Sequence, residues 1–388
     1  MTITLRGLKV WDGFKSLDAN TLVIEGARIA GLVDGRDQRV RDQSASIDCS
    51  GLTAIPGLID AHVHLELNPD DKDAPAQSKD DIVPLMAERA MKMAKAGITT
   101  ARDLGGGAWH ELALRDAIAC GDAVGPRLLC SGQPITSPRG HCHFWGGEAA
   151  SLDEAKSVLT RQLDHGVDLI KIMATGGRLT KGSEPTDAQF SQETLSALVA
   201  MAHASTRHVA AHCHGTEGIR RAANAGVDTI EHCSWVGPQG WASDFQEDVA
   251  QLIFDHGCWV SPTVNKGWQR MLDSKSGDVL NRVRRAYRHL LDLGVPMVAS
   301  TDAGIPGVYH EDLPHALLVF AAIAELSNEA TLRTATSDAA RALGVLDRTG
   351  SLESNKDADV LIVDGDPLTD LSALTRPVHV FARGRALL

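Results

Sequence analysis

The sequence predicts an α/β fold, a (β/α)8 barrel accompanied by a small β-sandwich that both chain ends build together. Three observations favour this fold. Strand-like runs alternate with helical patterns through the middle of the chain, which is typical of a parallel α/β protein. Both ends instead contain short β-type runs separated by turn residues. A length of 388 residues suits one barrel with one small accessory domain.

The two ends share the same composition of short, β-branched and aliphatic runs. The expected strands near the N-terminus are Thr2–Val10 and Thr21–Val33. Those near the C-terminus are Asp359–Val363 and Val378–Ala382. Neither end is large enough to bury a core alone, so we expect the two to pair into one sandwich. The predicted domains are residues 1–55 and 346–388 for the sandwich and 56–345 for the barrel.

The middle of the chain supplies eight expected strands. They are Thr53–Asp60, Ile98–Ala101, Arg127–Cys130, Val167–Ile172, Val209–His212, Asp228–Glu231, Trp259–Val264 and Val295–Ser300. Apolar residues at helical spacing predict helices between them, clearest in Asp80–Ala96, Gln192–Ala204 and Val279–Leu293. Gly97 follows the first of these helices as a C-cap.

Charge and cysteine content exclude several classes of protein. The formal net charge is −12, without long basic runs, so we expect neither a nucleic-acid nor a membrane partner. No apolar run is long enough to span a bilayer, and Met1–Arg6 lacks a secretory signal. The seven cysteines form no CxxC pair, which favours reduced thiols in a cytoplasmic protein. We also expect a homo-oligomer, whose subunit number the sequence does not specify.

The first chemical motif ends the first expected barrel strand. His62 and His64 are two residues apart, so both side chains project from the same face of that strand. Two neutral imidazoles suit Zn²⁺, and they also suit Fe, Mn or Ni. Such a pair alone is also compatible with two ordinary surface or core histidines. The downstream motifs decide in favour of a metal.

Lys171 lies inside an apolar strand, where an unpaired ammonium group is costly. One interpretation is a salt-bridged lysine, or one whose stem lies along the core while its head reaches water. The other is a carbamate, formed when the neutral amine adds CO₂ and releases a proton. A carbamate turns a buried cation into a bidentate anion, which two divalent ions would favour.

Three further motifs lie at later strand ends, where barrel enzymes place their active sites. His212 and His214 end the fifth expected strand on one face, and His232 follows the sixth. Asp302 follows the eighth and is placed to bind a metal and accept a proton. One such site alone is weak evidence, whereas five in chain order at strand ends favour a metal centre.

In these motifs the sequence resembles the amidohydrolase superfamily over nearly the whole chain. The segment Pro56–His64 matches its opening motif. Ile170–Gly177, Ala211–Gly215 and Ala225–His232 resemble the prolidase-like and imidazolonepropionase-like branch, which includes Xaa-Pro and Xaa-Arg dipeptidases. The turn at Asp357–Val360 resembles the returning sandwich strand of that family.

The resemblance implies two divalent metal ions, Zn²⁺ in our expectation. His62, His64 and Asp302 would hold the more buried ion, His212 and His232 the second, with a CO₂-derived carbamate on Lys171 between them. In this family the position of His214 faces the substrate. Cys213 and Cys233 flank metal ligands where the family often has small residues, and we expect both to be packing residues.

The resemblance implies hydrolysis of a small-molecule amide by a hydroxide that bridges the metals. Asp302 would act as general base and then as general acid toward the leaving nitrogen. For substrate contacts we expect His141, ahead of His143, in the loop after the third strand, where a solvent-facing role is the alternative. Arg178, Lys181, Tyr309 and His310 are candidates for a substrate carboxylate, or they are simply solvated. Trp109, Trp145, Trp235 and Trp268 either line an aromatic subsite or cap the core.

Several functions remain open at this point. The leading hypothesis is hydrolysis of a dipeptide or N-acyl amino acid. A second is hydrolysis of a cyclic amide, a carbamate or a xenobiotic amide, or deamination of a heterocycle. The motif around Lys171 disfavours deaminases, which in this superfamily usually use one metal and lack that lysine. A third is a non-catalytic binding protein, which the retention of all six ligand types disfavours.

Overall fold

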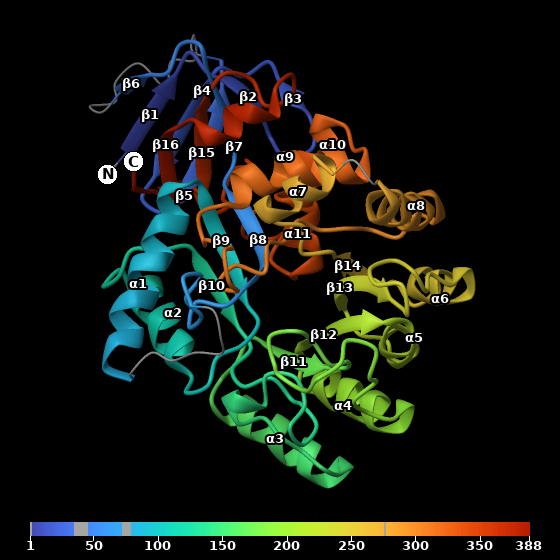
Figure 1. Cartoon of the computed structure of the whole chain (residues 1–388). Coiled ribbons are helices and arrows are strands. Elements are labelled where there is room, and N and C mark those ends of the chain that lie inside the picture. Colours follow the sequence, from blue (N-terminus) through green and yellow to red (C-terminus); the bar gives the residue numbers. More distant parts are fainter. Residues whose placement is uncertain (1, 35–45, 72–78, 275–276) are drawn as a thin grey trace.

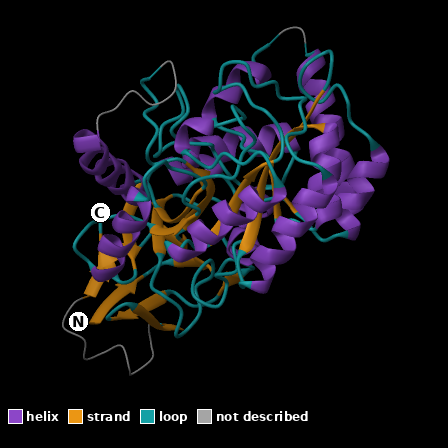
Figure 2. Cartoon of the chain, turned by 90° about the horizontal axis from the view of Figure 1, so that it is seen from below, coloured by secondary structure: helices purple, strands orange, loops and turns teal. Residues whose placement is uncertain are grey.

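The structure is a computed structural model that describes residues 2–34, 46–71, 79–274 and 277–388. Parallel strands flanked by helices occupy the middle of the chain, and mixed sheets from both chain ends lie beside them (Figure 1). Figure 2 shows the same two parts, with most helices gathered around the parallel strands. The predicted α/β composition is therefore confirmed.

Both ends of the chain contribute strands to one six-stranded sheet. Its order is β17 (Arg385–Ala386), β16 (Pro377–Ala382), β15 (Val360–Asp364), β7 (Leu52–Pro56), β2 (Lys9–Trp11) and β3 (Ser16–Leu17). A four-stranded sheet from the N-terminal region has the order β5 (Arg28–Val33), β4 (Thr21–Glu25), β1 (Thr2–Arg6) and β6 (Ser46–Asp48). One apolar cluster joins residues of both sheets, among them Leu5, Ile24, Val360 and Phe381. Strands from the two ends of the chain thus pair in one sheet.

The parallel strands form two groups. One is β10 (Arg127–Cys130), β9 (Ile98–Asp103) and β8 (Leu58–Val63), and the other is β11 (Leu169–Met173), β12 (His208–Gly215), β13 (Thr229–Val236) and β14 (Trp259–Ser261). All neighbours within each group are parallel. Single parallel bridges continue the pairing between the groups, at Ile135 with Ile172, Val260 with Met297, and Val63 with Ala303.

The helices follow the apolar periodicity of the sequence. They are α1 (Lys79–Lys95), α2 (His110–Cys120), α3 (Leu152–Asp164), α4 (Gln192–Ala204), α5 (Thr216–Ala225), α6 (Glu247–Asp255), α7 (Gln269–Leu272), α8 (Asp278–Leu293), α9 (Leu313–Ala324), α10 (Asn328–Thr334) and α11 (Ser337–Ala342). In α8, Leu280, Val283, Tyr287 and Leu290 share the buried face. Gly294 then ends the helix in the left-handed conformation, with φ of 87°.

Two strand predictions are wrong in detail. The expected strand Thr53–Asp60 divides at Gly57 into β7 and β8, which belong to different sheets. A Cβ atom at Gly57 would lie 2.1 Å from Thr99 Oγ1, so only glycine allows this close crossing. Val295–Ser300 forms no regular strand, because Pro296 has no N–H to donate, and only Met297 makes a bridge.

Six of the seven cysteines are buried, and Cys120 is exposed. All seven cysteines are free thiols. Cys213 and Cys233 are fully buried in the main apolar core, as expected for packing residues. Among the described parts of the chain, no helix has both the length and the apolar character that crossing a bilayer requires.

Candidate metal centre

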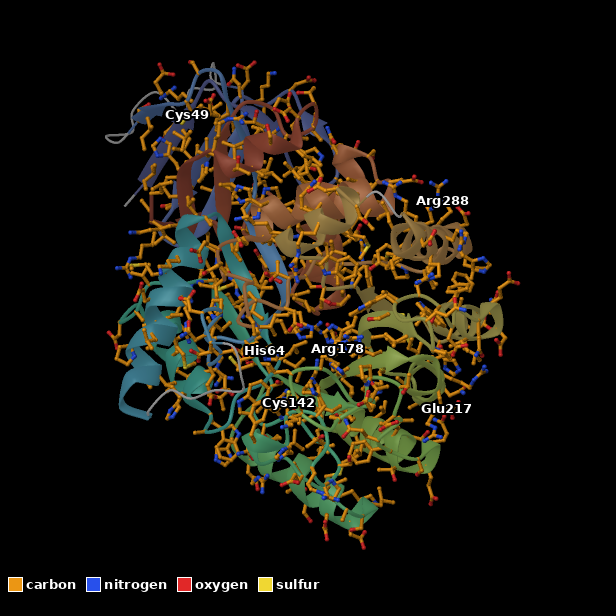
Figure 3. The ribbon with its side chains drawn as sticks, in the orientation of Figure 1. Cys49, His64, Cys142, Arg178, Glu217 and Arg288 are labelled. Atoms are coloured by element: carbon orange, nitrogen blue, oxygen red, sulfur yellow. The ribbon has the colours of Figure 1, made fainter. Side chains whose placement is uncertain are left out.

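A cavity of about 590 Å³ lies among the C-terminal ends of the parallel strands and the loops that follow them. His64, Cys142 and Arg178, which line it, lie near the centre of the molecule in Figure 3. The predicted site residues that line this cavity are His62, His64, His141, Lys171, Arg178, His212, His214, His232 and Asp302. The structure therefore gathers residues that are up to 240 positions apart in sequence (62 to 302) into one site.

His62, His64 and Asp302 converge from the end of β8 and the segment after Val295–Ser300. Asp302 Oδ1 lies 3.3 Å from His62 Nε2 and 3.4 Å from His64 Nε2. Asp302 reaches this position in the left-handed backbone region, with φ of 61°. Burial raises the pKa of its carboxyl, but the opposing effect of His62 and His64 is greater, so the pKa lies below its usual value.

His212, His214 and His232 form a second group from β12 and β13. Ring nitrogens of these three histidines lie within 4.8 Å of one another. The candidate ligand atoms of His232, His62 and Asp302 also lie within 4.8 Å of one another. His232 therefore joins the two groups. Burial is the largest cause of a lowered pKa in all four of these histidines. The pKa values of His212 and His232 lie well below the usual value, and those of His62 and His214 are about 4. The imidazoles are thus neutral at pH 7, as metal ligands must be.

One ring nitrogen of each of His64, His212 and His232 has a hydrogen-bonding partner outside the histidine cluster. His64 Nδ1 donates to Gly105 O at 3.1 Å, and His212 Nε2 donates to Gly176 O at 3.1 Å, because a carbonyl only accepts. His232 Nδ1 lies 2.9 Å from Thr263 Oγ1. Such outer partners are what fixes metal-binding histidines in orientation.

His62, Glu231 and Arg102 form a chain of hydrogen bonds. His62 Nδ1 donates to Glu231 Oε2 at 2.9 Å, and Arg102 Nη2 donates to Glu231 Oε1 at 2.7 Å. Burial raises the pKa of Glu231, but Arg102 and His62 together hold it below its usual value. Arg102 also donates Nη1 to Thr229 Oγ1 and Nε to Ala61 O, so each of its three nitrogens has a partner. Glu231 is therefore a buried carboxylate that is paired on both sides.

The backbone in the middle of β13 explains why Glu231 and His232 both reach the site. Successive residues of a strand normally face opposite sides. His232 has a φ of 66°, which breaks this alternation, and Cys233 follows with 46°. The rings of His62 and His232 therefore come within 5.1 Å while Glu231 still contacts His62. Strained backbone of this kind clusters at functional sites.

Lys171 lies in the middle of β11 with only 1% of its surface exposed. Within the described residues, its Nζ atom has no hydrogen-bond partner. Burial lowers the pKa of this amine to about 8. A buried ammonium without a partner is unfavourable, so the surroundings favour a neutral amine or a changed chemical group at this position. The salt-bridge alternative for Lys171 is not found among the described residues.

The predicted substrate contacts divide into two sets. His141 lines the cavity with its ring 4.5 Å from His212, and its Nδ1 has no partner among the described residues. Arg178 and Lys181 are exposed at the rim. His143 and Tyr309 do not line the cavity, and the Tyr309 hydroxyl donates to Asp70 at 2.6 Å. Buried His310 lies behind the site and contacts His64 O.

The tryptophans that line the cavity are Trp241 and Trp268, and sequence reasoning identified only the second of them. Trp235 packs on Phe245 in the core, and Trp109 stacks on His165 outside the cavity. Trp241 had one available signal, because it lies in the loop that follows the strand carrying His232. Thr263 and Glu231, the partners of His232 and His62, were also missed, since outer partners leave no spacing pattern.

Glu111, which is buried at the start of α2, is expected to make the stability of the protein depend on pH. Neither of its carboxyl oxygens has a hydrogen-bond partner in the described parts. Burial first, and the charge of Asp103 second, raise its pKa from 4.5 to about 8. The folded protein therefore holds a proton that the unfolded chain releases, so stability is lost as the pH rises from 4.5 through about 8.

We expect Glu111→Gln to remove this loss. The variant should raise the free energy of unfolding at pH 9 by about 1–3 kcal/mol, the usual cost of an unsatisfied buried group. At pH 5, where Glu111 is already protonated, the change should be small. Urea denaturation at the two pH values measures the difference. An effect of equal size at both would contradict the raised pKa.

Comparison with known proteins agrees with the geometry of the site. A solved Xaa-Pro dipeptidase with methionine bound in its active site is 27% identical, with a TM-score of 0.87 over 100% of this chain and 99% of that one. A prolidase complexed with N-methylphosphonate-L-proline is 26% identical, with a TM-score of 0.84 over 100% and 99%. Ochratoxinase of Aspergillus niger is 25% identical over 370 residues, or 85% of this chain and 75% of the relative.

The family assignment rests on most of the chain. The sequence profile of the amidohydrolase family matches residues 53–387, which include every residue of the site. Members of this family generally use a binuclear metal centre, and the cluster of histidines with Asp302 fits a metal site. The protein thus belongs to the amidohydrolase family, in its prolidase-like branch, and is a hydrolase that acts on carbon–nitrogen bonds.

Proposed function

We propose that this protein hydrolyses the amide bond of a dipeptide or an N-acyl amino acid at a centre of two divalent metal ions. The observation that carries the proposal is the buried, unpartnered Nζ of Lys171 beside two groups of neutral imidazoles. A lone structural metal would need no such lysine. The dipeptidase and prolidase among the similar structures support the same class of substrate.

The residues present fit two ions. We assign His62, His64 and Asp302 to one ion and His212 and His232 to the other, with the carbamate of Lys171 bridging them. This donor set of nitrogen and carboxylate-type oxygen suits Zn²⁺. To form the carbamate, the neutral Nζ adds to the carbon of CO₂ and releases one proton. The lowered pKa of Lys171, about 8, supports this step because only the neutral amine is nucleophilic.

The chain's own residues would carry the proton and hold the substrate. Two divalent ions, when bound, supply Lewis-acid activation of water and of the amide carbonyl. Asp302, ionised at neutral pH, accepts a proton from the attacking water and delivers it to the nitrogen as the C–N bond breaks. His141 has a free Nδ1, and we propose it, with His214, as a hydrogen-bonding partner of the substrate.

Arg178 is our candidate for holding the substrate's carboxylate. It lies at the rim of the cavity, and its positive charge acts on His214: burial lowers the pKa of His214, Asp302 raises it, and Arg178 lowers it again. A guanidinium presents two parallel donors, which match a carboxylate in a bidentate arrangement. Lys181 adds a second positive charge at the same rim.

The observed pairings also support the finer features of the fold. We propose that the parallel groups close into the (β/α)8 barrel of residues 56–345. The bridge from Val63 to Ala303 supports closure on one side, and those from Ile135 to Ile172 and from Val260 to Met297 support it on the others. We likewise propose that the two terminal sheets, from residues 1–55 and 346–388, form a β-sandwich around their shared apolar cluster.

Metal analysis and a substrate panel together test the proposed function. The protein, reconstituted with zinc and dialysed, is expected to hold about two ions per chain, in line with a two-metal site. It should release amine from members of a dipeptide and N-acyl amino acid panel. His212→Ala should lose zinc, whereas His143→Ala, outside the cavity, is the matched control and should keep both ions.

Each result has a defined meaning. One ion per chain in the reconstituted wild type would overturn the binuclear centre. Two ions without turnover of any dipeptide or N-acyl amino acid would overturn the substrate class. Activity on cyclic amides or carbamates in place of the panel would identify the alternative class.

A further inference from the structure

Two partly exposed tryptophans, Trp241 and Trp268, line one part of the cavity. Trp241 follows β13, and Trp268 ends the short 3-10 helix Lys266–Trp268 after β14. Their ring centroids lie 5.8 Å apart at 69°, an edge-to-face arrangement. The Trp241 ring also lies 5.4 Å from that of His214. Both side chains are only half-buried, so aromatic surface remains open toward the cavity.

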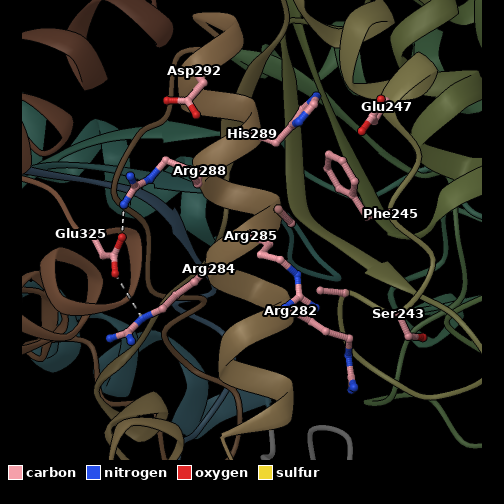
Figure 4. A pocket seen from close by; sticks show the side chains of 12 residues that line it. Ser243, Phe245, Glu247, Arg282, Arg284, Arg285, Arg288, His289, Asp292 and Glu325 are labelled. Carbon is pink, nitrogen blue, oxygen red and sulfur yellow. Dashed lines mark hydrogen bonds and ion pairs between the residues drawn. The ribbon is translucent and has the colours of Figure 1, made fainter.

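The scaffold holds Trp241 in place from outside the cavity. Arg282 on α8 donates Nε to Trp241 O and Nη2 to Gln239 O, both at 3.2 Å. In Figure 4, Arg284 and Arg288 extend toward Glu325, whereas Arg282 extends toward the segment that carries Ser243. Ala242 N also donates to Ser234 O at 2.9 Å. The loop with Trp241 is therefore tied to a helix and to the end of β13.

Trp268 is held by its own short turn. The Asn265 side chain accepts from Gly267 N at 3.0 Å, and Trp268 N donates to Asn265 O at 3.0 Å. The backbone that carries each ring is thus held in place before a ligand arrives, which limits the conformational entropy lost when one binds. Leu179 and Ile305, which line the same cavity, add apolar surface.

The arrangement around His214 relates this aromatic wall to the charged rim. The His214 ring lies 5.4 Å from the Trp241 ring, and Arg178 lines the same cavity as both residues. A ligand that carries a carboxylate and a ring a few bonds apart can therefore contact a cation and an aromatic pair within one cavity. An α-amino acid with an aromatic side chain has this form.

From this geometry we infer that Trp241 and Trp268 form a subsite for the ring of an aromatic amino acid, whose amide nitrogen is the one released. The inference rests on the proposed function and narrows its substrate class to N-acyl or aminoacyl derivatives of aromatic amino acids. The two tryptophans determine which side chain of the substrate binds, and the proposed metal centre carries out the hydrolysis.

The test uses two substrates that differ only in the π face of the ring. N-acetyl-L-phenylalanine and N-acetyl-L-cyclohexylalanine have similar size and the same carboxylate. The zinc-loaded wild type is expected to hydrolyse the first with a kcat/KM about 2- to 10-fold higher. Contacts between aromatic rings stabilise binding beyond the burial of apolar area, and this extra stabilisation corresponds to about that factor. Trp268→Leu and Trp241→Leu should each bring the ratio close to one, and Trp268→Phe should retain part of it.

Trp109→Phe is the matched control, because Trp109 bonds to Gln162 and stacks on His165 away from the cavity. Its ratio should equal that of the wild type. A wild-type ratio near one, or a ratio that survives in both leucine variants, would overturn the inference while leaving the proposed function intact. A preference for a ring on the acyl side, as in N-benzoylglycine against N-cyclohexanecarbonylglycine, would overturn it as well.

Failure of the proposed function gives a different pattern. In that case neither acetyl amino acid is hydrolysed, and calorimetric titration of the zinc-loaded protein with the same two compounds tests the subsite directly. Tighter binding of the phenylalanine compound, lost in Trp268→Leu, supports the inference without turnover. Equal binding of the two compounds overturns it.

Discussion

The Lys171→Ala protein is expected to bind less than two zinc ions per chain and to lose more than about 100-fold in turnover. Removal of a mere outer partner of a metal ligand already costs about 10- to 100-fold in affinity or activity. Lys171 is buried at the bottom of the cavity and, in our proposal, contributes the bridging anion itself. Zinc content measured after dialysis, together with the rate of amine release, tests this expectation.

Chemical rescue makes the test specific for a carbamate. Alanine leaves space where the lysine chain was, and a short carboxylic acid such as propionate offers the same bidentate anion. Added propionate should therefore restore part of the zinc and part of the activity in Lys171→Ala. It should do nothing in Lys171→Met, where the side chain fills the space. Full activity of Lys171→Ala with one ion per chain would overturn the binuclear centre.

Replacing Arg102 by methionine is expected to lower the free energy of unfolding by about 3–5 kcal/mol, the usual cost of breaking a buried ion pair. Arg102 is 2% exposed and Glu231 is fully buried, so the change leaves a negative charge in the interior. Methionine keeps much of the apolar stem of arginine, which limits the loss of packing. Thermal or urea denaturation at fixed zinc concentration measures the effect.

A double variant separates the charge from other effects. Arg102→Met with Glu231→Gln has no uncompensated charge, so it should recover a large part of the lost stability. Its zinc affinity should still fall, because His62 then has a neutral partner in place of a carboxylate. If Arg102→Met alone changed the free energy of unfolding by less than about 1 kcal/mol, water would have to solvate Glu231 and the buried pair would be of little importance.

Much of the site could be predicted because strand geometry relates spacing to direction. His62 and His64, two apart on a strand, have rings 5.2 Å from each other, and His212 and His214 have rings 4.5 Å apart. The ends of parallel strands meet at one edge, which brings residues of β8, β11, β12 and β13 into one cavity. Local periodicity and the parallel rule were sufficient for these residues.

Other features depend on contacts that no local pattern encodes. The division of Thr53–Asp60 at Gly57 depends on Thr99, which lies far along the chain. The positions of His232 and Asp302 depend on positive φ angles, 66° and 61°, that non-glycine residues adopt only under tertiary constraint. Trp241 faces the cavity because Arg282 holds its loop, a contact across 41 residues. Sequence spacing contains no trace of such partners.

The neighbouring positions of Glu231 and His232 have a consequence for how the centre fills. Glu231 bonds to His62, a ligand of the first ion in our proposal, and the next residue in the chain, His232, would be a ligand of the second. An ion that fixed the position of His232 would also fix the short piece of backbone from which Glu231 reaches His62. We therefore expect the two halves of the proposed centre to be thermodynamically linked through this peptide unit, so that an ion bound in one half favours binding in the other.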